Sequence, residues 1–408
     1  MSKRQITLYL HVHQPYRLGR YTAFDTAERH DYFATEAGDI RQDNEAIFKK
    51  VAQKSYWPMN RLLEKLLKDN PDFRLSLSIT GTFIEQALEW DPELIKSFQR
   101  LTSTGRVEIV AETYHHSLAF FYSRMEFEKQ VFMHREMVQR LFNQTPQVFR
   151  NTELAYNDEL AAWADEAGYK AVLAEGWDKI LGWRSPNYVY QPIGTSRLKL
   201  LLKNYRLSDD IAFRFSNRAW ADWPLTADKY LDWLDQLNDD QQLINLFMDY
   251  ETFGEHQWAD TGIFDFLEDF VSRWLNDGNG FLTTTQAADL PVVDRVSASE
   301  TVTWADNERD LTAWLGNRMQ QEAMKFLYEL EDDILRTHDQ GLIADWRLMQ
   351  TSDHSYYMCT KWWSDGDVHS YFSPYDSPYD AFMYFMNALR DLRWRLLEHQ
   401  KKAVSHGA

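Results

Sequence analysis

The sequence predicts an α/β fold of parallel strands and helices, followed by a helical C-terminal part. Short apolar runs rich in Val, Ile and Leu recur over residues 1–290, and stretches with helical periodicity separate most of them. Over residues 291–408 the apolar residues recur at three-and-four spacing instead. We therefore expect a catalytic domain at 1–290 and a helical domain at 291–408, a division that suits a chain of 408 residues.

The apolar runs of the first domain have the length and the β-branched composition of buried strands. Strands and helices that alternate in this rhythm predict either a parallel barrel or an open α/β sheet. The expected strands are Ile6–Val12, Phe73–Thr80, Arg106–Glu112, Gln147–Thr152, Lys170–Ala174, Arg197–Leu202 and Leu243–Met248.

Helix-terminal signals lie between several of these strands. Ser123 and Glu126 have the spacing of a capping box and open a segment that runs to Phe142. Gly168 ends a helix that begins near Asp158. 

Two further segments differ in character from the strand-and-helix region. Residues 176–196 contain no convincing helix signal, so this connection is expected to be irregular. Residues 310–338 and 377–402 carry helical periodicity, and no strand pattern of comparable quality follows residue 290.

The composition excludes several classes of partner and site. With 62 acidic and 44 basic residues the formal charge is −18, whereas binding to nucleic acid or an anionic membrane requires a basic face. The single cysteine, Cys359, excludes an internal disulfide and a cysteine-rich zinc site. No apolar run resembles a secretory signal or a membrane span. A soluble cytoplasmic protein with a neutral substrate is expected.

The first strand ends in two histidines on one face. His11 and His13 alternate with the apolar Leu10 and Val12, so both point the same way at the carboxyl end of the strand. They could contact a substrate, and a His-x-His pair on a strand is also a metal-ligand spacing. A metal-dependent barrel hydrolase that uses both histidines, a later histidine and Asp249 is therefore a competing interpretation.

Carboxylates follow the fourth and seventh expected strands. Glu153 shares a face with Asn151, and Asp249 shares a face with Glu251. In barrel enzymes the chemistry lies at the carboxyl ends of the strands, and glycoside hydrolysis requires two carboxylates that meet there. We expect the charge of Glu251 to raise the pKa of Asp249, as a general acid requires near neutrality.

Other strand ends are also polar, and the chain is rich in aromatic residues. Glu85 follows the second strand, His116 follows the third, and Trp177 follows the fifth. Together with Asn151 and Glu251 they are candidate substrate-binding residues. The 16 tryptophans include residues that can stack on the apolar face of a sugar ring, with Trp177, Trp220 and Trp304 as candidates.

Several segments together resemble the conserved regions of glycoside hydrolase family 57. The resemblance covers nearly the whole chain, and its segments are specific jointly, although each is weak alone. They are His11-Val12-His13-Gln14-Pro15, Gly105-Arg106-Val107-Glu108-Ile109-Val110, Asn151-Thr152-Glu153, Asp249-Tyr250-Glu251-Thr252-Phe253-Gly254, and the stretch from Val302-Thr303-Trp304 to Trp314-Leu315-Gly316-Asn317.

The resemblance implies an incomplete seven-stranded (β/α) barrel with a C-terminal helical domain that contributes to the active-site cleft. It implies a retaining enzyme of the α-amylase type that cleaves α-1,4-glucosidic bonds, with Glu153 as nucleophile, Asp249 as general acid/base, and no metal or other cofactor. His11, His13 and His116 would bind sugar hydroxyls, and Asp353 resembles a substrate contact offered by the helical domain. 

Three other functions stay open at this stage. The same family contains 4-α-glucanotransferases and branching enzymes, which transfer the sugar to another sugar instead of to water. A non-catalytic glucan-binding protein is a further alternative, although both carboxylates are present.

Overall fold

A computed structural model describes residues 4–33, 41–241, 243–361 and 373–406. The chain forms two compact units, which are described separately below. The first unit contains Met1–His13, Phe48–Glu112 and Met133–Trp304. The second unit contains Gln14–Ile47, Thr113–Phe132 and Ala305–Ala408.

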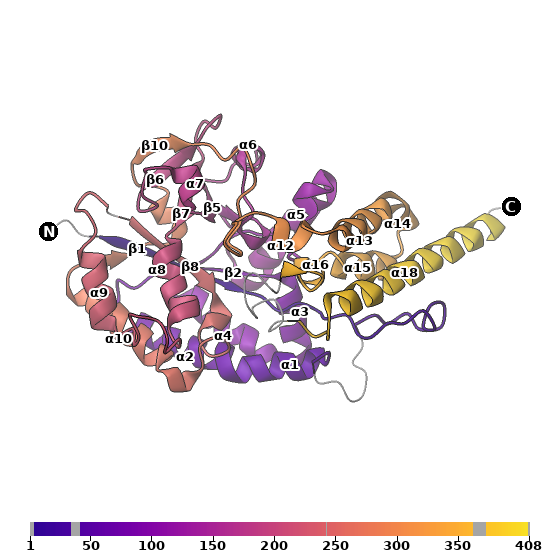
Figure 1. Cartoon of the computed structure of the whole chain (residues 1–408), viewed down its shortest axis with the longest axis horizontal. Coiled ribbons are helices and arrows are strands. Elements are labelled where there is room, and N and C mark those ends of the chain that lie inside the picture. The colour runs from indigo at the N-terminus through magenta and orange to yellow at the C-terminus, as the bar shows by residue number, and fades with distance from the viewer. Residues whose placement is uncertain (1–3, 34–40, 242, 362–372, 407–408) are drawn as a thin grey trace. The chain divides into compact units, whose positions relative to one another are not determined.

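The first unit is built on two five-stranded sheets (Figure 1). In one sheet the strand order is β3-β2-β1-β8, with β9 also paired to β1, and every pair is parallel. In the other sheet the order is β10-β6-β7-β5-β4, and only β6 and β7 run antiparallel. The strands are β1 (Gln5–Val12), β2 (Leu75–Ile79), β3 (Val107–Ile109), β4 (Val148–Arg150), β5 (Ala171–Glu175), β6 (Val189–Pro192), β7 (Lys199–Lys203), β8 (Leu243–Asp249), β9 (Gly280–Phe281) and β10 (Val292–Val296).

Backbone hydrogen bonds link the two sheets at both sides. Ala111, just beyond β3, forms a parallel bridge to Phe149 of β4 and accepts a hydrogen bond of 2.8 Å from the Arg150 N–H. On the other side, the Asn204 N–H that follows β7 donates to the Asn245 carbonyl of β8 at 2.9 Å. The parallel order therefore continues from β3 to β4, and β7 lies against β8.

All seven strands predicted from the sequence are confirmed, and the α/β class with them. Three strands were not predicted. The expectation of an irregular segment at 176–196 was wrong, because it contains the short helix α7 (Asp178–Leu181) and β6. The expectation of no strand beyond residue 290 was also wrong, since β10 lies there. Both strands are short and partly polar, so their pairing with neighbouring strands decides their conformation more than their local pattern does.

One apolar cluster combines side chains from strands of both sheets. Tyr9 of β1 and Phe247 of β8 contact edge to face, with ring centroids 5.5 Å apart. Alternate residues of a strand share a face, so this cluster defines an inner face for each strand that contributes to it. The buried members are Tyr9, Val110, Val148, Leu154, Ala171, Leu173, Val189, Leu201, Leu243, Phe247, Ala287 and Ala288.

Helices connect the strands of the first unit and lie outside the sheets (Figure 1). The predicted capping box at Ser123 is partly confirmed, because its hydroxyl accepts the Glu126 N–H at 3.1 Å, at the start of α5. Gly168 follows α6 with a left-handed φ of 85°, as predicted for a helix end. The helices are α2 (Trp57–Asp69), α3 (Gly81–Trp90), α4 (Pro92–Ser103), α6 (Asp158–Glu166), α7, α8 (Tyr205–Asp209), α9 (Ala227–Asp235), α10 (Ile263–Asn276) and α11 (Thr284–Ala287), while α1 (Asn44–Val51) and α5 (Arg124–Phe142) contain residues of both units.

The second unit is helical in its C-terminal part, as the periodicity of residues 310–338 and 377–402 predicted. The long helix α18 (Pro378–His406) packs against α13, α14 and α15 (Figure 1). The other members are α12 (Thr312–Leu315), α13 (Arg318–Glu329), α14 (Glu331–Thr337), α15 (Gln340–Leu348) and α16 (Ser352–Tyr356).

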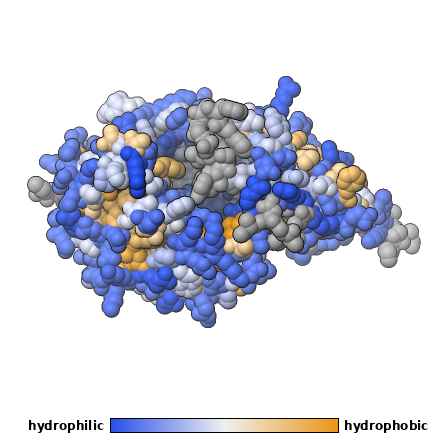
Figure 2. Space-filling view, turned by 60° about the horizontal axis from the view of Figure 1, so that its bottom comes forward, coloured by the Kyte–Doolittle hydropathy of each residue, from blue (hydrophilic) through white to orange (hydrophobic). Residues whose placement is uncertain are grey.

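The surface is predominantly hydrophilic, with apolar side chains in separate patches on the face drawn in Figure 2. Within the described part of the chain, no helix combines the length and the apolar character needed to cross a bilayer.

Candidate active site

A layer of charged side chains covers the apolar cluster at the carboxyl ends of the strands. Each charged residue lies two positions after a cluster residue, so it shares the inner face of its strand or of the strand's extension. We call His11, Glu112, Arg150, Glu175, Lys203 and Asp249 the charged layer; they follow Tyr9, Val110, Val148, Leu173, Leu201 and Phe247 respectively.

Opposite charges are paired within this layer. Nε2 of His11 lies 3.1 Å from Oε2 of Glu112, and the same oxygen lies 3.7 Å from Nη1 of Arg150. Nζ of Lys203 lies 3.6 Å from Oε2 of Glu175. The side chains of Glu112, Arg150 and Glu175 are fully buried. Buried charges require such partners, because an unpaired ion is strongly destabilising away from water.

Strand register brings the first histidine to the predicted acid. His11 and Asp249 are register partners in the β1–β8 pair, and Nδ1 of His11 lies 3.6 Å from Oδ1 of Asp249. The imidazole therefore has one ring nitrogen beside Glu112 and the other beside Asp249. A carboxylate beside each ring nitrogen holds the orientation of the imidazole.

Asp249 differs from the rest of the layer because its side chain remains 38% exposed. Desolvation tends to raise the pKa of Asp249, but the hydrogen bond and the charge of His11, with smaller contributions from His256 and Arg150, hold it below its ordinary value. The sequence-based expectation that Glu251 raises the pKa of Asp249 was therefore wrong. That expectation considered one neighbouring charge and could not include the imidazole from another strand.

The pKa of Glu251 is shifted in the opposite direction to that of Asp249. Burial, followed by the charge of Asp249, raises the pKa of Glu251 to about 8. Its Oε1 accepts hydrogen bonds from the Tyr56 hydroxyl at 2.6 Å and from the His13 N–H at 3.1 Å. The side chain expected to bind substrate is thus buried and holds the loop that follows β1.

Glu153 lies in a short 3₁₀ turn, Thr152–Leu154, immediately after β4. Its backbone is left-handed, with φ 59° and ψ 25°, and Leu154 also has a positive φ of 51°. Non-glycine residues rarely adopt this conformation, and they do so mainly where the surrounding structure fixes a functional side chain. The conformation of this turn, and not that of the preceding strand, therefore sets the direction in which the Glu153 side chain points.

Trp304 connects the two predicted catalytic acids. Its indole Nε1–H donates to Oε2 of Glu153 at 2.9 Å, and its backbone N–H donates to the Glu153 carbonyl at 3.3 Å. Its ring contacts that of His11 edge to face, with centroids 6.3 Å apart. The Arg150 guanidinium and the Lys203 ammonium lie 4.9 and 5.6 Å from the Trp304 ring centroid. The chain of contacts Glu153–Trp304–His11–Asp249 therefore places both acids on one cluster of side chains.

The other predicted residues of the first unit have varied positions. His13 stacks on His11, with ring centroids 5.7 Å apart, and its Nδ1 lies 3.0 Å from the Thr80 hydroxyl. Asn151 is buried and donates through Nδ2 to the Ala155 carbonyl at 3.1 Å, so it supports the Glu153 turn, while its Oδ1 has no hydrogen-bond partner among the described residues. Glu85 is half-buried on α3, and Trp177 is half-buried at the start of α7, beneath the Lys179 ammonium.

His116 and Asp353 belong to the second unit. His116 is buried with a φ of 52°, and its carbonyl accepts the Ser352 N–H at 2.9 Å. A bridge between Ser117 and Thr351 runs beside this bond. The structure thus brings these two predicted residues onto neighbouring segments of the same unit.

Sequence reasoning did not assign roles to Glu112, Arg150 and Lys203. Their signal is positional, because each is a charged residue that continues the inner face of a strand, two residues beyond an apolar one. This signal can be recognised only when the inner face is known, since the strands are buried on both faces and their sequences do not distinguish the two.

Trp220 lines a hollow whose walls include no residue of the charged layer. The hollow has a volume of about 460 Å³ and is lined by Arg206, Asp210, Arg214, Trp220, Asp222 and Trp233. 

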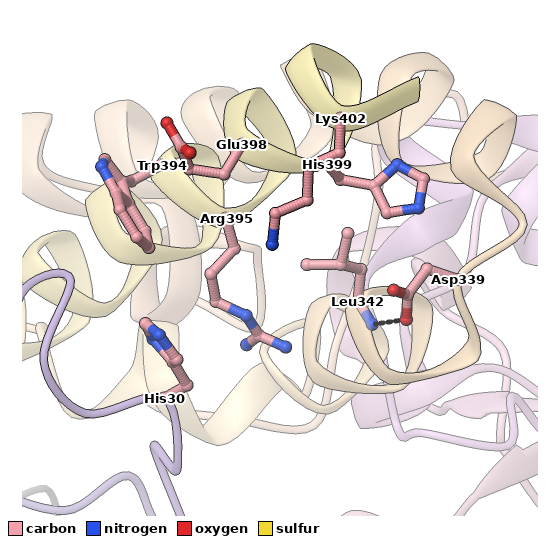
Figure 3. Close-up of a pocket in the computed structure, with 8 residues that line it drawn as sticks. All are labelled: His30, Asp339, Leu342, Trp394, Arg395, Glu398, His399 and Lys402. Carbon is pink, nitrogen blue, oxygen red and sulfur yellow. Dashed lines mark hydrogen bonds between the residues drawn. The ribbon is translucent and has the colours of Figure 1, made fainter. Parts of the chain in front are cut away.

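The second unit has another hollow, of about 290 Å³, beside α18 (Figure 3). His30 there stacks on Trp394 and lies 2.9 Å from Asp391, and Arg395 pairs with Asp345 at 2.6 Å. These cationic groups already have carboxylate partners, so we assign no ligand to this hollow.

Comparisons with known proteins point to one family. The model of glycosyl hydrolase family 57 matches residues 7–300. A protein of Methanocaldococcus jannaschii named "Putative alpha-amylase" is 43% identical over 411 residues, which cover 96% of this chain and 85% of that protein.

Two solved structures have similar folds at low sequence identity. A branching enzyme from Thermococcus kodakaraensis has a TM-score of 0.66 at 13% identity, over 87% of this chain and 86% of that one. A 4-alpha-glucanotransferase from Thermococcus litoralis has a TM-score of 0.62 at 15% identity, and the match covers 87% of this chain but only 56% of that chain.

The family match and the relative from Methanocaldococcus jannaschii identify the chain as a glycoside hydrolase. The chain belongs to glycosyl hydrolase family 57.

Proposed function

We propose that this protein is a retaining α-glucan-active enzyme of the α-amylase type, which cleaves α-1,4-glucosidic bonds by double displacement. The observation that carries the proposal is the contact chain Glu153–Trp304–His11–Asp249, which joins two carboxylates from distant segments. The name of the relative from Methanocaldococcus jannaschii supports an amylase. The strands β1, β2, β3, β4, β5, β7 and β8 would form the incomplete seven-stranded barrel.

In the first step Glu153 is the nucleophile. Its carboxylate attacks the anomeric carbon while Asp249 transfers its proton to the leaving glycosidic oxygen, so a glycosyl-enzyme ester forms and one sugar chain departs. The indole donor on Oε2 fixes the direction of the Glu153 carboxylate. In the second step water attacks the same carbon, Asp249 takes the proton of that water, and Glu153 leaves as a carboxylate.

Asp249 must be protonated before the first step, although its pKa is lowered in the free protein. A sugar that covers its 38% exposed side chain would complete the desolvation, which raises the pKa of a carboxyl group. Substrate binding itself would thus prepare the general acid.

Products of maltoheptaose test the function. Shorter oligosaccharides alone mean an amylase, longer chains mean a 4-α-glucanotransferase, and new α-1,6 linkages mean a branching enzyme. Transfer and branching both stay as alternatives, because one structural neighbour is a 4-alpha-glucanotransferase and the other a branching enzyme. Retention predicts that the first product formed is the α-anomer by NMR, and a β-anomer would refute the double displacement.

The catalytic assignment has its own test. Glu153→Gln and Asp249→Asn should each abolish turnover of maltoheptaose while circular dichroism stays unchanged. If Glu153→Gln keeps most of its rate, the nucleophile is another residue. Stoichiometric zinc in the purified active protein would instead favour a metal-dependent hydrolase that uses His11.

A further inference from the structure

The hollow around Trp220 lies on the segment that leaves β7 at the edge where the catalytic acids lie. β7 ends at Lys203, a member of the charged layer, and α8 begins at Tyr205. α8 continues into a π-helical turn, Asp210–Arg214, and a loop leads from there to α9. The walls of the hollow come from these consecutive elements, so the hollow belongs to the first unit alone.

Two indoles form the aromatic part of the hollow. The rings of Trp220 and Trp233 are 6.0 Å apart and inclined by 72°, so they stand edge to face. Both side chains are only half-buried, whereas tryptophan side chains are highly buried on average. An indole that borders an open hollow offers an apolar surface to a ligand with an apolar face.

The charged groups of the hollow are balanced. Arg214 pairs with Asp210 at 2.5 Å, and Arg206 pairs with Asp178 at 2.8 Å. Asp222 adds a carboxylate at the exposed rim. Because each arginine has a carboxylate partner, the hollow lacks the excess positive charge that a phosphate or an acidic peptide requires. It offers donors and acceptors to a neutral molecule with many hydroxyl groups.

We propose that this hollow is an accessory α-glucan-binding site, at which Trp220 and Trp233 contact the apolar faces of glucose units and Asp210, Asp222 and Arg206 bind their hydroxyls. The inference rests on the proposed function for the identity of the sugar. The proposed site would bind the glucan chain at a position distant from the bond that is cleaved.

Binding of maltoheptaose to the full chain carrying Glu153→Gln tests the site without turnover. Adding Trp220→Ala should weaken the affinity by about tenfold in calorimetry, because one aromatic contact is lost. The matched control is Trp183→Ala, since Trp183 is 88% exposed and lies outside the hollow, and it should leave the affinity unchanged. Asp222→Asn at the rim should weaken binding to a smaller extent and is too exposed to prevent folding.

The outcomes separate this site from the proposed function. If the wild type cleaves maltoheptaose but Trp220→Ala and Asp222→Asn bind it as tightly as the control does, the accessory site is refuted and the function stands. If no α-glucan is converted but maltoheptaose binds and Trp220→Ala weakens it, the function fails and the site stands. Equal weakening by Trp183→Ala would show a non-specific effect and would overturn the site.

Discussion

The indole N–H of Trp304 lies 2.9 Å from Oε2 of Glu153, while the ring of the same residue contacts His11. Trp304 was expected to be a stacking surface for sugar. Its hydrogen bond indicates a different role: the Trp304 indole orients the carboxylate that is proposed to attack the anomeric carbon. The cationic groups of Arg150 and Lys203 beside its ring hold the indole in turn.

Trp304→Phe should therefore reduce kcat while the ring contact with His11 is kept. A hydrogen bond to a charged group contributes about 2 kcal/mol, which corresponds to about 30-fold in rate. Steady-state kinetics on maltoheptaose measures the loss. Trp183→Phe, at an exposed position, is the control, and equal kcat values for the two variants would contradict the role of the indole donor.

His11→Asn should move the alkaline limb of the kcat/KM profile to higher pH. His11 lowers the pKa of Asp249, and the enzyme needs that carboxyl in its protonated form, so removal of the imidazole extends the protonated range upward. The absolute rate should fall as well, but the position of the limb is the informative quantity. An unchanged limb would mean that another group governs it.

Glu251→Gln should change how stability depends on pH. In the wild type the pKa of Glu251 is raised to about 8 by burial and by Asp249, compared with an ordinary value of 4.5. Between these values the unfolded chain releases a proton that the folded protein keeps, so the free energy of unfolding falls as pH rises. The variant lacks this pH-dependent contribution to the free energy of unfolding. Its stability relative to the wild type should therefore increase from pH 5 to pH 8, as measured by urea denaturation. A constant difference between the two proteins would show that Glu251 is not protonated in the fold.

Glu112→Gln should destabilise the fold and disturb His11. Both Glu112 and Arg150 are fully buried, and loss of the carboxylate charge leaves Arg150 poorly compensated, at a cost of about 3 kcal/mol. The control is Glu93→Gln, because Glu93 pairs with Lys96 on the surface and such pairs contribute less than about 1 kcal/mol. Similar unfolding free energies for both variants would contradict a structural charge at position 112.

The seven strands were predictable because each lies in an apolar or alternating run of the sequence. The missed strands β6 and β10 carry more polar residues, and neighbouring strands determine their conformation. The direction of the Asp249 pKa shift was also not predictable, since its main counterweight to desolvation is an imidazole more than 200 positions away in the chain.

The sequence by itself determined the α/β class, the positions of seven strands, and the placement of Glu153 and Asp249 just where two of them end. These follow from local periodicity and from the chemistry of the residue types. Only the tertiary structure decided which face of each strand points inward, that Glu112, Arg150 and Lys203 form a charged layer, and that Trp304 joins the two acids. The physical reason is that pairing of buried charges depends on strand register and sheet closure, which bring together residues distant in sequence.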